Sequence, residues 1–204
     1  MQQTERWEDP QEALRAALDG RQKEIWTAMP GIIVSRSGNQ VSVQPAIKAK
    51  HQDQKGNITD VALPVLIHCP LVTPGGGGYA VTLPIGAGDE VLVVFASRCI
   101  DGWWQQGGVQ PQMEIRMHDL SDGFAIPGYL SQANAITSIS DTTAQLRSLD
   151  GDTYVDIDNS GTVTVKASTI NLDGVVTING TGTMTINGNL LVNGNIHATG
   201  TITP

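Results

Sequence analysis

The feature that most constrains this chain is a six-residue repeat in its last part. Apolar side chains recur at every sixth position, and glycines follow the same period: Leu172, Ile178, Met184, Leu190, Ile196 and Ile202, with Gly182, Gly188, Gly194 and Gly200. No charged residue occurs from Gly174 to Pro204, and no aromatic residue follows Tyr154. Asn-Gly pairs, as at Asn187-Gly188, are typical of tight turns between very short strands.

An uncharged strand repeat of this kind needs a partner of the same period, because free strand edges promote aggregation. One candidate is a left-handed hexapeptide β-helix, but six hexads complete only about two coils, fewer than the three or so units that such folds need. The other is an intertwined shaft of three chains, whose strands pair between chains. The lack of charge favours the shaft, since identical charges near a threefold axis would repel. Residues 151–204 are therefore predicted to form a trimeric β-helical spike shaft, and the chain a homotrimer.

Residues 1–29 are expected to be a helical segment. Asp9 is a candidate cap, Pro10 suits the first turn, and Glu12 completes a capping box. The pattern predicts a helix over 9–26 with one stripe that is apolar except at its arginine: Leu14, Ala17, Leu18, Arg21 and Ile25. Such a helix can dock on its own domain, pair with its copies or reach a partner.

Residues 30–110 are predicted to form a small β-domain. Five runs rich in β-branched residues alternate with turn segments: Gly31–Ser35, Gln40–Ala49, Asn57–Ile67, Tyr79–Pro84 and Glu90–Ser97. Short strands with no long helix between them suit a closed Greek-key barrel of the OB-fold type. Residues 111–150 lack a clear pattern and are expected to be a connector. The fold class is thus all-β.

The net charge and the start of the chain bear on its partners and its cellular compartment. The net charge is −8 and the sequence pI about 4.8, so nucleic acid is not expected as a partner. The start of the chain has no apolar stretch typical of a secretory signal, which predicts synthesis in a cytoplasm. The two cysteines, Cys69 and Cys99, occur in apolar surroundings and are expected to be buried free thiols.

Motifs that suggest catalysis or ligand binding are weak. Gly75–Gly78 is followed by Tyr79-Ala80-Val81 instead of the Gly-Lys-Ser/Thr of a phosphate loop, so a turn is predicted. His118, Asp119 and Ser121 share only residue types with a catalytic triad. No catalytic or cofactor-binding residue is predicted, and no enzyme activity. The Trp103-Trp104 pair is expected to cap the barrel or fill a subunit contact, with an exposed recognition patch as the alternative.

Three joined motifs resemble a known phage family. They are Leu63–Pro70 followed by Gly75–Gly78, then Leu83–Val91 continuing to Ser97–Trp104, and finally Arg116–Gly123. Over roughly residues 30–130 the chain resembles the baseplate spike, or membrane-piercing protein, of contractile-tailed phages, of the Gp138 type by its N-terminal domain. The resemblance implies an OB-fold domain that attaches to a baseplate hub protein, and a trimeric needle that transiently enters the bacterial outer membrane.

The expected function is therefore that of a structural virion component, the central spike of the tail baseplate. Two alternatives remain. A trimeric tail-fibre or adhesin module would be expected to carry aromatic side chains on the shaft. A hexapeptide-repeat acyltransferase would need a catalytic histidine between complete coils, and the repeat ends too soon.

His197 is the one candidate metal ligand. It lies inside the charge-free repeat, where three copies would meet near one axis, although an ordinary outward-facing position remains an alternative. Some related spikes bind iron at the tip through a His-x-His pair from each chain, whereas this sequence has His197-Ala198-Thr199. A transition metal, iron or zinc, held by three copies of His197 is the resulting hypothesis.

Overall fold

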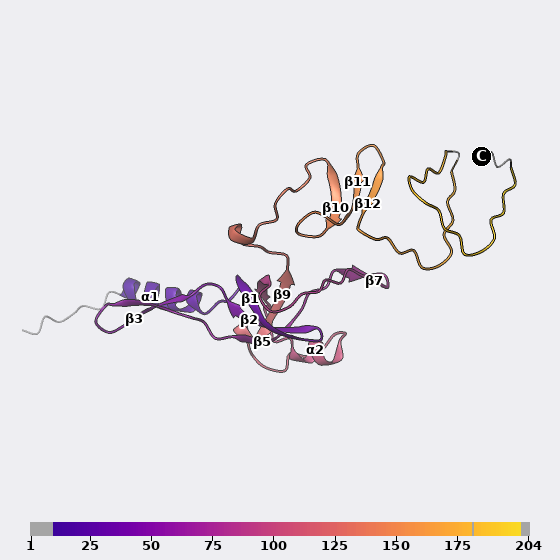
Figure 1. The fold of residues 1–204 in the computed structure, drawn as a ribbon. Coiled ribbons are helices and arrows are strands. Elements are labelled where there is room, and N and C mark those ends of the chain that lie inside the picture. Colours follow the sequence, from indigo (N-terminus) through magenta and orange to yellow (C-terminus); the bar gives the residue numbers. More distant parts are fainter. Residues whose placement is uncertain (1–9, 181, 201–204) are drawn as a thin grey trace, which may run out of the picture. The chain divides into compact units, whose positions relative to one another are not determined.

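The computed structural model describes residues 10–180 and 182–200, in two compact units that divide between Thr137 and Ser138 (Figure 1). Helix α1 (Pro10–Lys23) confirms the predicted N-terminal helix, with Pro10 in its first turn, whereas Asp9 lies outside the described residues. Leu14 and Leu18, on the predicted stripe, are each 61% exposed. After the helix, the Trp26 amide donates to the carbonyl of His118 at 3.1 Å, which joins this segment to the β-domain.

The main sheet of the first unit has five antiparallel strands in the order β5-β2-β1-β8-β9. They are β1 (Ala28–Ser37), β2 (Gln40–Pro45), β5 (Leu66–Pro70), β8 (Glu90–Phe95) and β9 (Gly123–Pro127). Its two outer strands approach each other, because Leu71, just after β5, forms a parallel bridge with Ala125 of β9. The Val72 amide donates to the Ala125 carbonyl at 2.8 Å. The sheet is therefore curled towards a barrel.

The interior of this sheet is built from alternate strand positions. Every second residue of β2 and of β8 is buried, as the two-residue period of a strand requires. The core consists of Ile33, Val41, Val43, Leu66, Cys69, Leu71, Val91, Val93, Phe95 and Ala125. A Cβ on Gly31 would overlap the Val43 side chain of the paired strand β2, so the close packing at this position favours glycine. Half of these core residues are β-branched and one, Phe95, is aromatic, which is consistent with an aromatic content of only 4%.

Shorter elements project from the curled sheet. They are the hairpins β3–β4 (Ala49–Gln52, Ile58–Val61) and β6–β7 (Gly75–Gly76, Tyr79–Ala80), helix α2 (Asp101–Gln106) and the 3₁₀ helices η1 (Leu120–Asp122) and η2 (Gln132–Asn134). The β6–β7 hairpin confirms the turn predicted at Gly75–Gly78, and Gly77 and Gly78 supply its positive φ angles of 60° and 87°.

One of the five predicted strands, Tyr79–Pro84, does not join the main sheet. Within the predicted strand Tyr79–Pro84, only Tyr79–Ala80 forms β-pairs, and its partner is β6 in the same short hairpin. The place beside β8 is taken by β9, from the segment expected to be a connector. The main sheet therefore continues past residue 110.

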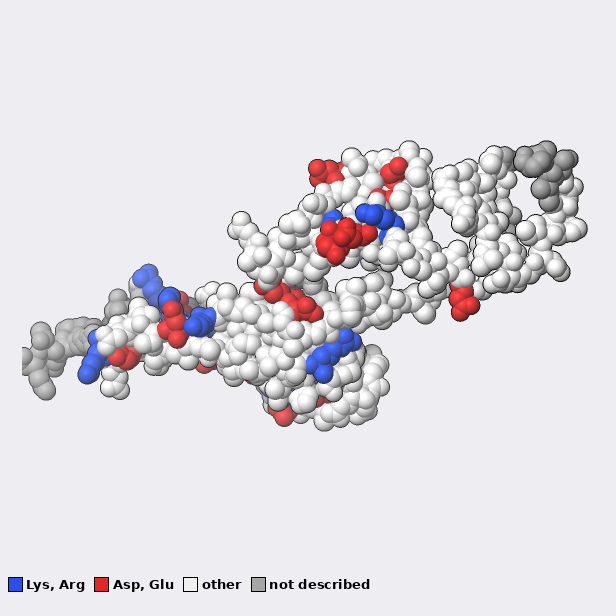
Figure 2. Space-filling view, viewed as in Figure 1, with Lys and Arg blue, Asp and Glu red and all other residues white. Residues whose placement is uncertain are grey.

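The second unit contains a three-stranded antiparallel sheet of β10 (Thr143–Arg147), β11 (Tyr154–Asp158) and β12 (Val163–Lys166). Within the described residues after β12, namely 167–180 and 182–200, this single chain forms no helix or strand. Ile202 of the six-residue repeat lies outside the described residues. The predicted shaft would pair strands of three different chains. A single chain does not test that pairing, so the shaft stays a prediction. Figure 2 shows the charge-free character of this region, which is white where Figure 1 draws the chain yellow.

Candidate functional site

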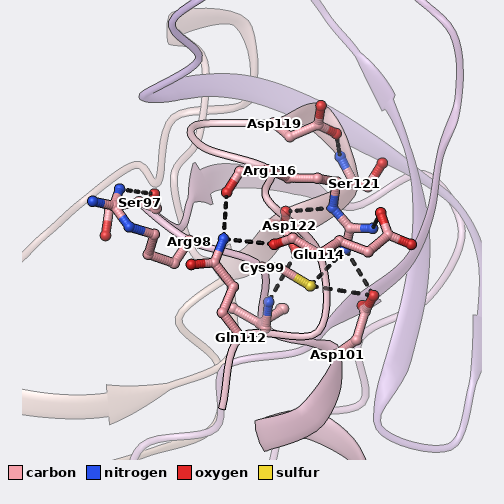
Figure 3. Close-up of polar contacts among 11 residues, drawn as sticks. Ser97, Arg98, Cys99, Asp101, Gln112, Glu114, Arg116, Asp119, Ser121 and Asp122 are labelled. Atoms are coloured by element: carbon pink, nitrogen blue, oxygen red, sulfur yellow. Dashed lines mark hydrogen bonds and ion pairs between the residues drawn. The ribbon is translucent and has the colours of Figure 1, made fainter.

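Arg116 lies at the centre of a cluster of acidic side chains in the first unit (Figure 3). Its Nε and Nη2 atoms donate to the two carboxylate oxygens of Asp122, each at 3.0 Å, in a bidentate pair. Nη2 also donates to Asp101 at 2.8 Å, and Nη1 donates to Glu114 at 2.8 Å. Asp122 is fully buried, so its negative charge depends on this guanidinium for compensation.

The cluster connects three separate segments of the chain. Asp101 begins α2, Arg116 belongs to the loop after it, and Asp122 ends η1 just before β9. The Asp122 carboxylate also accepts from the amide of Ile100 at 3.0 Å, and its carbonyl accepts from Ala96 at 2.8 Å. These bonds hold α2 and the start of β9 against the end of β8.

The ion pairs shift the titration of their members. A hydrogen bond from Arg116 lowers the pKa of Asp101 below its ordinary value, and hydrogen bonds to Asp122 and then Asp101 raise the pKa of Arg116. The pKa of Asp119 is lowered mainly by the backbone amide of Ser121. In each case the hydrogen bonds stabilise the charged form.

A metal ion does not fit this cluster. The Cys99 Sγ and one oxygen each of Asp101 and Asp122 lie within 4.8 Å of one another, a spacing that could hold an ion. However, Nη2 of Arg116 lies 3.2 Å from Cys99 Sγ, 2.8 Å from Asp101 and 3.0 Å from Asp122. A guanidinium in contact with all three groups occupies the position of a cation and supplies the positive charge itself. The arrangement is therefore an ion-pair cluster.

The residues that share types with a catalytic triad have separate roles. Asp119 accepts from the amide of Ser121 at 2.8 Å and caps η1. His118 has a positive φ of 52°, and its Nδ1 lies 3.3 Å from the carbonyl oxygen of Trp26. Among the described residues no hydrogen bond joins His118 to Asp119 or Ser121. These side chains shape the loop before β9.

The cysteine prediction is confirmed for one residue. Cys69 is buried in the core, and desolvation raises the pKa of its thiol to about 11. Cys99 is also free but only half-buried, at the edge of the Arg116 cluster.

The tryptophan pair lies on α2. The ring of Trp103 is 5.7 Å from that of Phe124 in β9, so α2 packs against this outer strand of the curled sheet. Trp103 remains 46% exposed. His197 is exposed and lies in the described part of the chain that forms no strand. The hypothesis that three copies of His197 meet on one axis is not tested by a single chain.

The sheet of the second unit has one apolar face. Its register sets Leu146 opposite Val155 and Val155 opposite Val165, and likewise Ala144, Ile157 and Val163 across the three strands. All six side chains are exposed. Leaving Ala144 aside, their exposed fraction ranges from 41% for Val155 to 66% for Leu146. The opposite face is polar: Thr143, Gln145, Arg147, Tyr154, Asp156, Asp158, Thr164 and Lys166.

This sheet face and the Arg116 cluster were both missed from the sequence. The two-residue alternation of Val155-Ile157 and Val163-Val165 was a signal for the apolar face, but the six-residue period that follows is stronger. The cluster had no local signal, because its members come from three segments. Among the described residues, no helix is long and apolar enough to cross a bilayer.

Comparison with known proteins places the curled sheet in a phage context. Residues 29–128, which contain all five strands from Met29 onwards together with the Arg116 cluster, match the family model described as phage protein Gp138 N-terminal domain. No curated protein matches the chain. Over these residues, just under half of the chain, the protein is similar to the N-terminal domain of phage proteins of the Gp138 type.

Proposed function

We propose that this chain is the central spike of a contractile-tail baseplate, a structural virion component that punctures the bacterial outer membrane as a homotrimer. The observation that carries the proposal is the match of residues 29–128 to a phage protein domain. In this proposal the first unit attaches to a baseplate hub protein, and the charge-free end forms the needle. The protein acts mechanically and is not an enzyme.

The strand arrangement supports an OB-type barrel for the first unit. Five strands of a curled antiparallel sheet, with the outer pair meeting at Leu71 and Ala125, suit a small, partly open Greek-key barrel. The Arg116 cluster braces this barrel, since it holds α2 and the loop before β9 in place. A rigid barrel is suited to transmit an axial load from the tail to the needle.

The second unit supports a trimer. A three-stranded sheet with one apolar face needs a cover of comparable area, because exposed apolar patches of this kind mark interaction surfaces. Three copies that turn these faces towards a common axis would cover one another. The residues that follow carry the six-residue repeat without any charge, so the same three chains can continue into an intertwined shaft.

Labelled tail particles test the proposal and its polarity. The Pro204 end is expected at the distal tip of the baseplate, because an uncharged segment enters lipid at lower cost than a charged one. Gold particles bound to a C-terminal tag should mark that tip in electron micrographs, and gold bound to an N-terminal tag should lie nearer the tube. Absence of the protein from tail particles would reject the proposed function. A C-terminal label beneath the tube would reject only the polarity.

The proposed tip metal depends on three chains. His197 belongs to no group of metal-ligating side chains within the described part of one chain, so any site must combine copies. Three imidazoles can bind iron or zinc and would stop the chain ends from fraying. Elemental analysis of untagged protein is expected to give about one metal per trimer, lost in His197→Ala. A metal-free trimer would leave His197 as an ordinary shaft residue.

A further inference from the structure

An open groove lies where α1 ends, between the start of β1 and the β3–β4 hairpin. Its apolar lining includes the half-buried Trp26, Met29 and Leu63 and the more exposed Ile25 and Ile47. Trp26 also packs against Phe95 of the core at a ring distance of 6.4 Å, so the floor of the groove is fixed to the barrel. The groove therefore offers a concave apolar surface on a rigid support.

Three of the chain's five lysines line this groove. They are Lys23 at the end of α1 and Lys48 and Lys50 at the start of the hairpin, and among the described residues no acidic side chain lines the groove. Asp60 lies close by and pairs with Lys50 at 2.9 Å, but both side chains are more than half exposed. A surface pair of that kind contributes little, so an acidic ligand can compete for Lys50.

The charge of the rest of the chain makes this location distinctive. Residues 1–61 contain eight Lys or Arg and eight Asp or Glu, whereas residues 62–204 contain four and twelve, which accounts for the whole net charge of −8. Figure 2 shows blue side chains around α1 and β3, with red ones between them. An acidic partner is therefore repelled by most of the molecule and attracted to the lysine-lined groove.

We propose that this groove binds an acidic segment of another protein, one that carries an apolar anchor side chain. The inference rests on the proposed function only for where the partner is found, which would be the baseplate. The floor around Trp26 supplies the desolvated contact for the anchor, and the three lysines at the rim accelerate association and select negative charge. A concave groove with a fixed aromatic floor suits an inserted chain segment better than it suits a flat membrane surface.

A labelled synthetic peptide of alternating Glu and Leu residues tests the groove on the full chain by fluorescence anisotropy. The Lys23→Glu/Lys48→Glu/Lys50→Glu variant should bind it at least about tenfold more weakly. The matched control Lys55→Glu/Lys166→Glu reverses the two lysines outside the groove and should bind within about twofold of the original chain. A peptide with Ser for each Leu should bind weakly to all three proteins.

Four results would overturn the proposal. They are no binding by the original chain, equal binding by both variants, equal binding of the Ser peptide, and binding that appears only when residues 1–9 are removed. The last would assign the groove to the chain's own acidic start, which contains Glu5, Trp7 and Glu8. Lysine-dependent sedimentation with vesicles of phosphatidylglycerol and phosphatidylcholine, without peptide binding, would assign it to a membrane.

Particle incorporation separates this proposal from the proposed function. The original chain should be recovered in tail particles, and the triple lysine variant should be depleted from them although it still forms trimers. Equal recovery of both would overturn the groove as the attachment site. Recovery of neither would reject the spike function, and the peptide result would then decide the groove by itself.

Discussion

The substitution Val165→Lys is expected to convert the proposed trimer into monomers, whereas Thr164→Lys at the neighbouring position is expected to leave it intact. The two positions are adjacent on β12 and differ in the face of the sheet they occupy. Val165 lies opposite Val155 on the apolar face, and Thr164 lies opposite Asp156 on the polar face. The pair of variants therefore tests which face of the sheet the three chains share.

The size of the effect follows from burying charge. In the proposed trimer each Val165→Lys substitution would place an ammonium group against apolar side chains and near its two symmetry copies. Burial of an uncompensated charge costs several kcal/mol, so three copies should raise the dissociation constant by at least about a hundredfold. At Thr164 the new lysine stays in solvent beside Asp156, and the change in stability should be within about 0.5 kcal/mol.

Light scattering coupled to size exclusion at micromolar concentration measures the outcome directly. The original chain and Thr164→Lys should both elute with the mass of three chains, and Val165→Lys with the mass of one. Circular dichroism of Val165→Lys should show that the curled sheet remains folded, because its core lies entirely in the first unit. A monomeric original chain would contradict the trimer, and a trimeric Val165→Lys would contradict this interface.

Sequence patterns predicted the strands whose inward positions carry apolar side chains larger than alanine. β2 and β8 alternate valines with other residues, and both were found within their predicted runs. β9 was missed because its buried residues are Gly123 and Ala125, while the larger Phe124 faces outward onto Trp103. A strand that places small residues in the core gives no two-residue apolar pattern, and glycine also weakens strand propensity.

The opposite error occurred at Tyr79–Pro84. Its residues have high β-propensity. That propensity reflects how well a side chain fits a pleated, half-buried surface, and it does not predict which strand, if any, will pair with the segment. Tyr79 is 85% exposed and Val81 is 52% exposed, so this run never enters the core. The Arg116 cluster was equally out of reach, since Asp101, Arg116 and Asp122 meet only after β8 and β9 have paired. The place of the segment Tyr79–Pro84 and the formation of the Arg116 cluster both depend on which strands pair in the folded chain.

Replacing Arg116 with methionine is expected to destabilise the first unit by about 3–5 kcal/mol. Methionine keeps much of the side-chain volume but removes the only cation that contacts Asp122 among the described residues. Asp122 would keep the hydrogen bond from Ile100, yet its carboxylate would stay fully buried without a counter-charge. Arg98→Met is the matched control: Arg98 is exposed and donates to the carbonyl of Ser97, and its loss should cost less than about 0.5 kcal/mol.

Urea unfolding followed by tryptophan fluorescence, at one protein concentration because a trimer's stability depends on it, gives the free energies. The double variant Arg116→Met/Asp122→Asn should recover about 1–2 kcal/mol relative to Arg116→Met, because it removes the uncompensated charge and leaves an acceptor for Ile100.

The dependence of stability on acid pH is an independent test of the Arg116 cluster. The lowered pKa of Asp101 stabilises the fold above the carboxyl's ordinary value of 3.8, and this contribution is lost as pH falls through the lower pKa of the folded state. Arg116→Met should therefore flatten the acid limb of the stability profile, and an unchanged limb with unchanged urea stability would mean that the cluster contributes nothing to the fold.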